Sequence, residues 1–313
     1  GLGASFSNAR SLVTMKHVGL NVAADVIFTA AYTGVSGALV VVSADDPGMH
    51  SSQNEQDNRR YAVAAGVPMF EPADAQEAYD YTHAAVEVSE RWGVPVLLRV
   101  TTRVCHTTAL VRGRHTSAPT PPRFSRNPQG LVMIPAHARP AHKRLRAKLD
   151  DIQRWNEKCA FNAVHGSGGE FGIITSGVCY LHAREAAPNA NILKLGMTHP
   201  LPIAKIRNFR QTVERCWVIE ENDPYLAEAI RAAGIEVECA PAEFRFGELN
   251  VDRVRRILTH ATAPDLPLAP GRPPQLCQGC PHRVVFETLR ELDVIVAGDI
   301  GCYTLGVLPP FEA

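Results

Sequence analysis

The chain has 313 residues, of which 45% are hydrophobic and 20% are charged, and its 32 basic and 32 acidic residues cancel to a net charge of zero. Because acids and bases are interspersed, no basic face or polybasic run indicates a nucleic-acid or membrane partner. The longest apolar runs have the length of strands and fall far below the roughly 18 residues of a membrane span. We therefore expect a soluble, cytoplasmic α/β protein.

Residues 1–103 alternate between helical and strand patterns. Helical patterns cover 3–12, 19–32, 58–65 and 73–93, and buried-strand patterns cover 12–17, 37–44 and 94–102. Alternation at this spacing predicts a doubly wound parallel sheet. Asp74 is placed to cap the last helix, with Glu77 at its third position, and Gly93 is placed to end it.

Residues 104–165 predict a linker and a connecting helix. The Pro-, Ser- and Arg-rich stretch at 112–130 cannot pack as a core, whereas 140–158 has an amphipathic helical pattern. A glycine-rich hinge then opens a second α/β domain at 166–262. Its predicted strands are 171–177, 191–196, 215–221 and 234–239, and its predicted helices lie near 178–187, 202–213 and 224–233.

A second linker, 262–275, leads into a third unit at 276–313. After a cysteine-containing turn, this unit has a predicted helix at 281–292 and a predicted strand at 294–301. A strand-helix-strand fragment cannot bury both faces of its sheet. We therefore expect this third domain to be incomplete in this chain.

Three cysteines of the third unit, Cys277, Cys280 and Cys302, form a CxxC…C pattern. Zinc and iron–sulfur clusters usually take four ligands, so a shared metal site, a zinc knuckle and unliganded thiols all stay open. A thioredoxin-type pair is disfavoured, because Pro281 opens the next helix and the third cysteine would have no role. In a shared site the three sulfurs should lie within a few ångströms of one another, without the other five cysteines.

Several turns follow predicted strands. The stretch "MKHVGLN" (15–21) turns from a strand into a helix and predicts either a polar ring or anion site, or an ordinary loop with His17 on the surface. The polar loop "DPGMHSSQNEQDNR" (46–59) is either functional or a solvated helix-capping segment. Asp299 in "GDIG" lies where α/β sheets bind ligands, although for a lone motif a plain strand-to-loop turn with a capping Asp is the preferred interpretation. We interpret "TSG" (175–177) as a tight connection.

Five stretches in this order resemble one family: "GASFSNARSLVTMKHVGLNVAAD", "ADDPGMHSSQNEQDNR", "VPVLLRVTTRVCH", "CQGCPH" and "GDIGCYTLGVLPP". They resemble the large (alpha) subunit of indolepyruvate ferredoxin oxidoreductase, one of the thiamine-diphosphate-dependent 2-oxoacid ferredoxin oxidoreductases. The likeness covers essentially the whole chain.

The resemblance implies a multidomain α/β fold of doubly wound parallel sheets. Residues 1–103 would be the C-terminal part of the pyrimidine-binding thiamine-diphosphate domain. Residues 166–262 would form a domain like the C-terminal domain of transketolase, and 276–313 would begin the diphosphate-binding domain. The implied cofactors are thiamine diphosphate, Mg²⁺ and a 4Fe–4S cluster. The implied partners are ferredoxin, coenzyme A, the 2-oxoacid and a smaller beta subunit or a fused equivalent, in an oligomer.

The resemblance also implies site residues. The thiamine diphosphate contacts would be His17, Gly19, Asn21, Asp299 and Gly301. The substrate contacts would be Ser51, Ser52, Gln53 and Asn54, and the cluster ligands would be Cys277, Cys280 and Cys302.

Departures from the family pattern limit what this chain can do alone. The glutamate that protonates the aminopyrimidine is expected before Gly1, and the magnesium motif is expected beyond Ala313. We therefore expect these 313 residues to be an inactive fragment of the enzyme. Two alternatives stay open: the same chemistry on another 2-oxoacid such as pyruvate, and a non-catalytic α/β assembly module with a CxxC zinc site.

Overall fold

The structure is a computed structural model. It describes residues 1–113, 121–166, 168–264, 275–292, 294–298 and 300–312. The chain divides into two compact units, 1–264 and 265–313. Each unit is described by itself.

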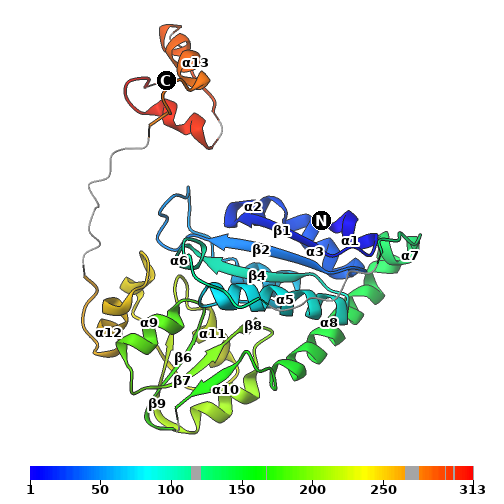
Figure 1. Cartoon of the computed structure of the whole chain (residues 1–313), viewed down its shortest axis with the longest axis vertical. Coiled ribbons are helices and arrows are strands. Elements are labelled where there is room, and N and C mark those ends of the chain that lie inside the picture. The colour runs from blue at the N-terminus through cyan, green and yellow to red at the C-terminus, as the bar shows by residue number, and fades with distance from the viewer. Residues whose placement is uncertain (114–120, 167, 265–274, 293, 299, 313) are drawn as a thin grey trace. The chain divides into compact units, whose positions relative to one another are not determined.

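The first unit contains two five-stranded sheets (Figure 1). The first sheet has the order β1-β2-β4-β3-β8. Its strands are β1 (Ser11–Lys16), β2 (Leu39–Asp45), β3 (Met69–Phe70), β4 (Val96–Thr101) and β8 (Met197–His199). The pairs among β1 to β4 are all parallel, as the alternating pattern predicts, and β8 pairs antiparallel with β3.

Helices connect and cover the strands of the first sheet. They are α1 (Leu2–Phe6), α2 (His17–Val22), α3 (Ala24–Thr33), α4 (Arg59–Ala65), α5 (Ala75–Trp92) and α6 (Thr102–Cys105). The prediction of a helix over 3–12 is wrong beyond Phe6, because Ser11 already pairs with Leu39 in the parallel ladder. The predicted helix at 19–32 is divided into α2 and α3.

The predicted capping of α5 is confirmed. The Asp74 carboxylate accepts a hydrogen bond of 2.8 Å from the backbone N–H of Glu77, and Gly93 ends the helix in the left-handed conformation, with φ of 57°. The N-cap satisfies one of the donors that the first turn leaves unpaired.

A long connecting helix links the two halves of this unit. It is α8 (Pro135–Asn156), preceded by the short α7 (Pro128–Leu131). One side of α8 is buried and carries Ala141, Leu145, Leu149 and Ile152. The helix begins five residues earlier than predicted, because Pro140 lies inside it instead of starting it.

The second sheet has the order β10-β9-β6-β7-β5. Its strands are β5 (Ala163–His165), β6 (Gly169–Ser176), β7 (Asn191–Leu195), β9 (Val213–Ile219) and β10 (Glu238–Cys239). Its helices are α9 (Cys179–Ala186), α10 (Ile203–Arg210), α11 (Tyr225–Ala232), the 3-10 helix η1 (Ala242–Arg245) and α12 (Val251–Leu258). The four predicted strands are present and parallel, and the unpredicted β5 is antiparallel to β7.

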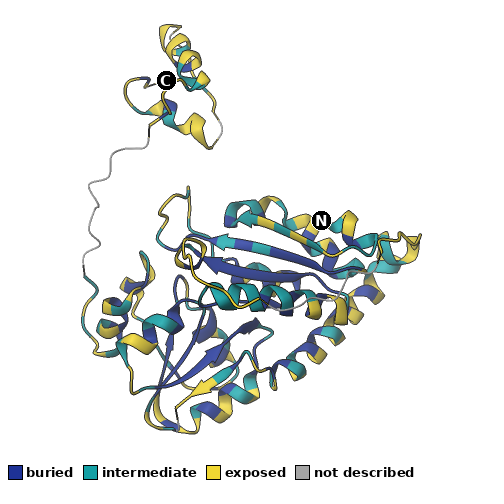
Figure 2. Cartoon of the chain, viewed as in Figure 1, coloured by how far each residue is buried: buried dark blue, intermediate teal, exposed yellow. Residues whose placement is uncertain are grey.

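The two sheets share one core. A single cluster of buried hydrophobic side chains includes Val40 and Leu98 of the first sheet together with Leu193 and Val218 of the second. Figure 2 shows that the central strands of both sheets are buried. The two α/β segments that the sequence separates by a linker are thus packed together through apolar side chains.

The second unit, 265–313, is small. Its described elements are α13 (Pro281–Glu291) and the 3-10 helix η2 (Cys302–Val307), packed around Leu276, Phe286 and Phe311. The predicted helix is therefore confirmed. The predicted strand at 294–301 is absent from the described residues of that segment, and no described residue of this unit forms a strand with which it could pair.

Across the described residues, no helix has both the length and the apolar character needed to cross a membrane.

The cap of α5 gives a first prediction. Asp74→Ala should lower the free energy of unfolding by about 1 kcal/mol, because the Glu77 N–H loses its acceptor. Asp74→Asn keeps an acceptor oxygen and should change stability by only a few tenths of that amount. Urea titration followed by circular dichroism measures both variants. Equal losses would contradict a capping role.

Candidate functional site

Polar side chains gather where the strands of the first sheet end. Lys16 is the last residue of β1, Asp45 the last of β2, and Thr102 directly follows β4. A cavity of about 420 Å³ opens at this edge, with Lys16, Asp46, His50 and Ser51 in its lining. The carboxyl ends of parallel strands are where α/β sheets bind ligands.

Asp46 organises the polar loop that follows β2. One carboxylate oxygen accepts the His50 N–H at 3.2 Å and the Thr102 hydroxyl at 3.0 Å, and the other accepts the Ser51 N–H at 2.9 Å and the Ser52 hydroxyl. Burial alone would raise the pKa of Asp46, but these hydrogen bonds and the Lys16 ammonium group 3.6 Å away lower it to about 2. The loop is therefore anchored around a carboxylate that is ionised at neutral pH.

The turn at the end of β1 lies against the same loop. His17 is fully buried, so the interpretation as a surface histidine is wrong. Its Nε2 lies 3.1 Å from the Asn54 carbonyl oxygen, and Asn58 donates to the His17 carbonyl at 3.2 Å. Its Nδ1 is buried and has no hydrogen-bond partner among the described residues.

The other expected contact residues near this turn differ in exposure. Gly19 has no room for a side chain, since an added Cβ would lie 2.9 Å from the Met15 Cβ. Asn21 is exposed and accepts a hydrogen bond from the Tyr61 hydroxyl. Among the predicted substrate contacts, Ser52 is half-buried, whereas Ser51, Gln53 and Asn54 are exposed. The structure thus places the predicted thiamine diphosphate contacts of the first domain and the predicted substrate contacts at the same edge of the sheet.

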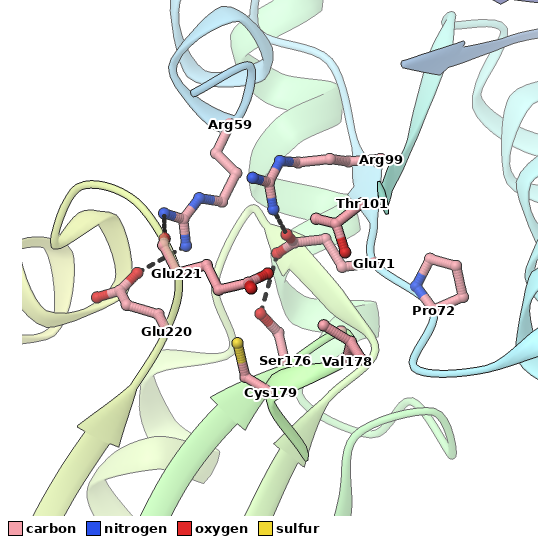
Figure 3. Close-up of a pocket in the computed structure, with 11 residues that line it drawn as sticks. Arg59, Glu71, Pro72, Arg99, Thr101, Ser176, Val178, Cys179, Glu220 and Glu221 are labelled. Carbon is pink, nitrogen blue, oxygen red and sulfur yellow. Dashed lines mark hydrogen bonds and ion pairs between the residues drawn. The ribbon is translucent and has the colours of Figure 1, made fainter. Parts of the chain in front are cut away.

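A network of buried charges lies beneath this edge (Figure 3). Arg99, in the centre of β4, donates to Asp45 and to Glu71, both at 2.6 Å. Arg59 donates to Asp57 at 2.8 Å and to Glu220 at 2.6 Å. The Arg99 and Arg59 side chains are 4% and 1% exposed, so their charges are compensated by carboxylates instead of water.

The network crosses from the first sheet to the second. Glu71 follows β3 and accepts a hydrogen bond of 3.1 Å from Ser176, the last residue of β6. Glu220 directly follows β9. Only Gly177 and Val178 separate β6 from α9, in agreement with the interpretation of 175–177 as a tight connection. The sequence analysis did not identify these charges, although an arginine inside the apolar run "VPVLLRV" was a signal that could have been used.

Glu221 is the buried carboxylate of this region whose charge is least compensated. Burial raises its pKa to about 7, against the Leu249 N–H at 3.1 Å and the charge of Arg99. Ionisation of this group therefore falls close to neutral pH.

In the second unit, Cys277 and Cys302 are exposed and Cys280 is half-buried. The Cys280 N–H donates to the Cys277 carbonyl at 3.1 Å, which forms the predicted turn before Pro281. The expected convergence of three sulfurs is not seen: the described residues contain no group of three or more His, Cys, Asp or Glu side chains that could hold a metal ion. Gly301 precedes η2 with φ of 127°, and Asp299 lies outside the described residues.

The fold places the protein in a known structural class. The structure is similar to 2-oxoglutarate:ferredoxin oxidoreductase from Magnetococcus marinus, with a TM-score of 0.65 and 18% identity over 83% of this chain and 54% of that chain. The expected α/β fold class is therefore confirmed.

The sequence comparison is more specific. The chain is 39% identical to indolepyruvate oxidoreductase subunit IorA of Archaeoglobus fulgidus over 343 residues, and 39% and 37% identical to the subunits of that name from Methanothermobacter thermautotrophicus and Pyrococcus abyssi. Each match covers 99% of this chain and 54–55% of the relative, so the chain spans about half the length of these relatives. No family model matches the sequence. The resemblance to indolepyruvate oxidoreductase alpha subunits is confirmed.

Glu221 gives a pH prediction. Burial raises the pKa of Glu221 from 4.5 in the unfolded chain to about 7 in the folded protein. The resulting contribution to stability is fully present below pH 4.5 and is lost as pH rises through about 7. Glu221→Gln keeps an acceptor for the Leu249 N–H and should remove this loss. At pH 8 the free energy of unfolding of Glu221→Gln should therefore exceed that of the parent by up to roughly 3 kcal/mol. At pH 5 the two proteins should differ little.

Thermal unfolding at the two pH values measures the gain, with the exposed Glu236→Gln as the matched control. A Glu221→Gln variant whose stability relative to the parent is the same at both pH values would contradict the raised pKa.

Proposed function

We propose that this chain is the substrate- and pyrimidine-side part of an indolepyruvate ferredoxin oxidoreductase alpha subunit. The enzyme would oxidatively decarboxylate aryl-2-oxoacids to acyl-CoA and pass the electrons through iron–sulfur clusters to ferredoxin. The likeness to IorA subunits over 99% of the chain carries this proposal. The polar loop and the His17 turn at one sheet edge support it, because ligands of α/β sheets bind there.

The cofactor side is assigned to His17, Gly19 and Asn21. Thiamine diphosphate, when bound, supplies the electron sink that makes decarboxylation of a 2-oxoacid feasible. The residues fit a polar ring: the buried Nδ1 of His17 has no partner among the described residues, and Gly19 lets the turn pack closely. The Asn54 carbonyl and Asn58 hold the His17 imidazole and its backbone in place before any ligand arrives.

The substrate side is assigned to the loop residues Ser51, Ser52, Gln53 and Asn54. Lys16 is added, because its ammonium group lies beside this loop and lines the 420 Å³ cavity. Asp46 already accepts four hydrogen bonds, so it compensates the Lys16 charge only in part. Lys16 can therefore attract the carboxylate of a 2-oxoacid. Because Asp46 already orders the loop, the loop loses little further conformational entropy when the substrate binds.

The remaining assignments concern the second unit. Cys277, Cys280 and Cys302 are proposed as ligands of a 4Fe–4S cluster, which requires Cys302 to approach the other two cysteines more closely than it does among the described residues. Asp299 and Gly301 are proposed as contacts of thiamine diphosphate. The CxxC turn before α13 supports the first two ligands, since it places Cys277 and Cys280 on one short turn. Ferredoxin, coenzyme A and a smaller beta subunit or a fused equivalent are the proposed partners.

The substrate role of Lys16 predicts a selective defect. In the full-length enzyme, Lys16→Met should raise the KM for indolepyruvate about tenfold, because one charge-assisted hydrogen bond of roughly 1.5 kcal/mol is lost. The affinity for thiamine diphosphate should stay within twofold. Lys158→Met, at an exposed position after α8, is the control and should leave both quantities unchanged. An unchanged KM in Lys16→Met would remove Lys16 from the substrate site.

The cluster assignment predicts a spectroscopic change. In the full-length protein purified without oxygen, Cys280→Ser should reduce the visible iron–sulfur absorbance and the bound iron, while thiamine diphosphate binding remains. The exposed Cys105, in the first unit, provides the control variant Cys105→Ser. Equal iron content in the two variants would show that Cys280 is not a ligand.

A further inference from the structure

A second cavity lies away from the residues assigned above. Its volume is about 450 Å³, within the range of small-molecule sites. It is lined by the start of α5 on one side and by β5, α9 and β7 on the other. It shares no lining residue with the cavity at the polar loop.

The α5 side of this cavity is acidic. It presents Asp74, Glu77 and Asp80. Both Glu77 oxygens are engaged, one by the Ala73 N–H at 2.9 Å and one by Lys194. One Asp74 oxygen accepts the Glu77 N–H at 2.8 Å, and one Asp80 oxygen accepts the Gln76 side-chain amide at 3.1 Å. Among the described residues, the other oxygen of each has no hydrogen-bond partner.

The opposite side is basic and is built around the Tyr180 ring. The Lys194 ammonium nitrogen lies 4.5 Å from the ring centroid, the Arg184 guanidinium carbon 5.7 Å, and the His165 ring 5.2 Å. The Lys194 side chain is 7% exposed, and its only described carboxylate partner is Glu77. Arg184 forms no ion pair with any described carboxylate.

The electrostatics of the basic side favour an anion. Burial lowers the pKa of His165, and the charges of Lys194 and Arg184 lower it further, against the opposing charge of Glu77. The charges of Lys194 and Arg184 therefore outweigh that of Glu77 at this imidazole. An incoming carboxylate would relieve the repulsion.

We propose that this cavity binds a zwitterion, a free α-amino acid with an apolar or aromatic side chain. Its carboxylate would meet Lys194 and Arg184, and its ammonium group would meet Asp74 and Asp80. A ligand of one charge would face like charges on one wall, whereas a zwitterion is complementary to both. Phe161 and Leu181 also line the cavity and can contact the ligand's side chain.

The cavity shares no residue with the proposed cofactor and substrate contacts, so the site stands independently of the proposed function. One wall comes from α5, which covers the first sheet, and the other from β5, α9 and β7 of the second half. A ligand in this cavity would therefore contact both halves of the first unit.

Isothermal titration calorimetry on the full-length protein tests the proposal with three probes of similar size. L-Phenylalanine carries both charges, 3-phenylpropionate lacks the ammonium group, and 2-phenylethylamine lacks the carboxylate. We expect L-phenylalanine to bind at least about tenfold more tightly than either analogue, since each analogue loses one charged contact. Equal affinity for L-phenylalanine and 3-phenylpropionate would overturn the zwitterion assignment, as would an absence of L-phenylalanine binding.

Variants locate the binding on the cavity walls. Arg184→Gln and Asp80→Asn should each weaken L-phenylalanine binding about fivefold or more without changing the unfolding temperature, because Arg184 is exposed and Asp80 half-buried. Arg91→Gln, an exposed arginine near the end of α5, is the control and should bind normally.

A proton NMR titration adds a direct readout, in which L-phenylalanine should raise the pKa of His165. Unchanged affinity in both wall variants, or an unmoved His165 titration, would overturn the site.

Discussion

Arg99 sits in the centre of a strand that is otherwise apolar and buried, and the arrangement of both sheets depends on how its charge is compensated. Its guanidinium group donates to Asp45 at the end of β2, to Glu71 after β3 and to Asn222 after β9. Removing one partner of such a buried pair typically costs 3–5 kcal/mol, because the remaining charge stays uncompensated. The net stability gained from a buried ion pair is small, because desolvation offsets the attraction, so we interpret the network mainly as a constraint on how the ends of these strands meet.

The same network supports the candidate site above it. Asp45 and Asp46 are adjacent in the chain: the first binds Arg99 inside the protein, and the second holds the polar loop. Asp45 also accepts the Asn58 N–H at 3.0 Å, so the loop is tied at its start and at its end. A loop with few apolar side chains is thereby given a defined shape without a core of its own.

Local sequence patterns predicted the parallel strands other than β3, the cap and end of α5, and most helices of both halves, though not α12, because each of these depends on neighbouring residues. They did not predict β8, β5 or the shared core, since these depend on contacts between distant segments. His17 shows the same limit at the site. Its position in a turn was predictable, but its complete burial results from Asn54 and Asn58 folding back over it. The cavity beside Lys194 was not predicted, because Lys194 and its partner Glu77 on the opposite wall lie 117 residues apart in sequence.

The antiparallel strand β8 has a consequence for the order of events during synthesis. It covers the outer edge of β3, yet it is encoded about a hundred residues after β4, beyond the long helix α8. A nascent chain that has already formed β1 to β4 therefore carries an open strand edge until Met197–His199 leaves the ribosome. Such edges pair readily with other chains. Because β3 has only two residues, the open edge that it presents is short. A short edge limits pairing with other chains before β8 is available to cover it.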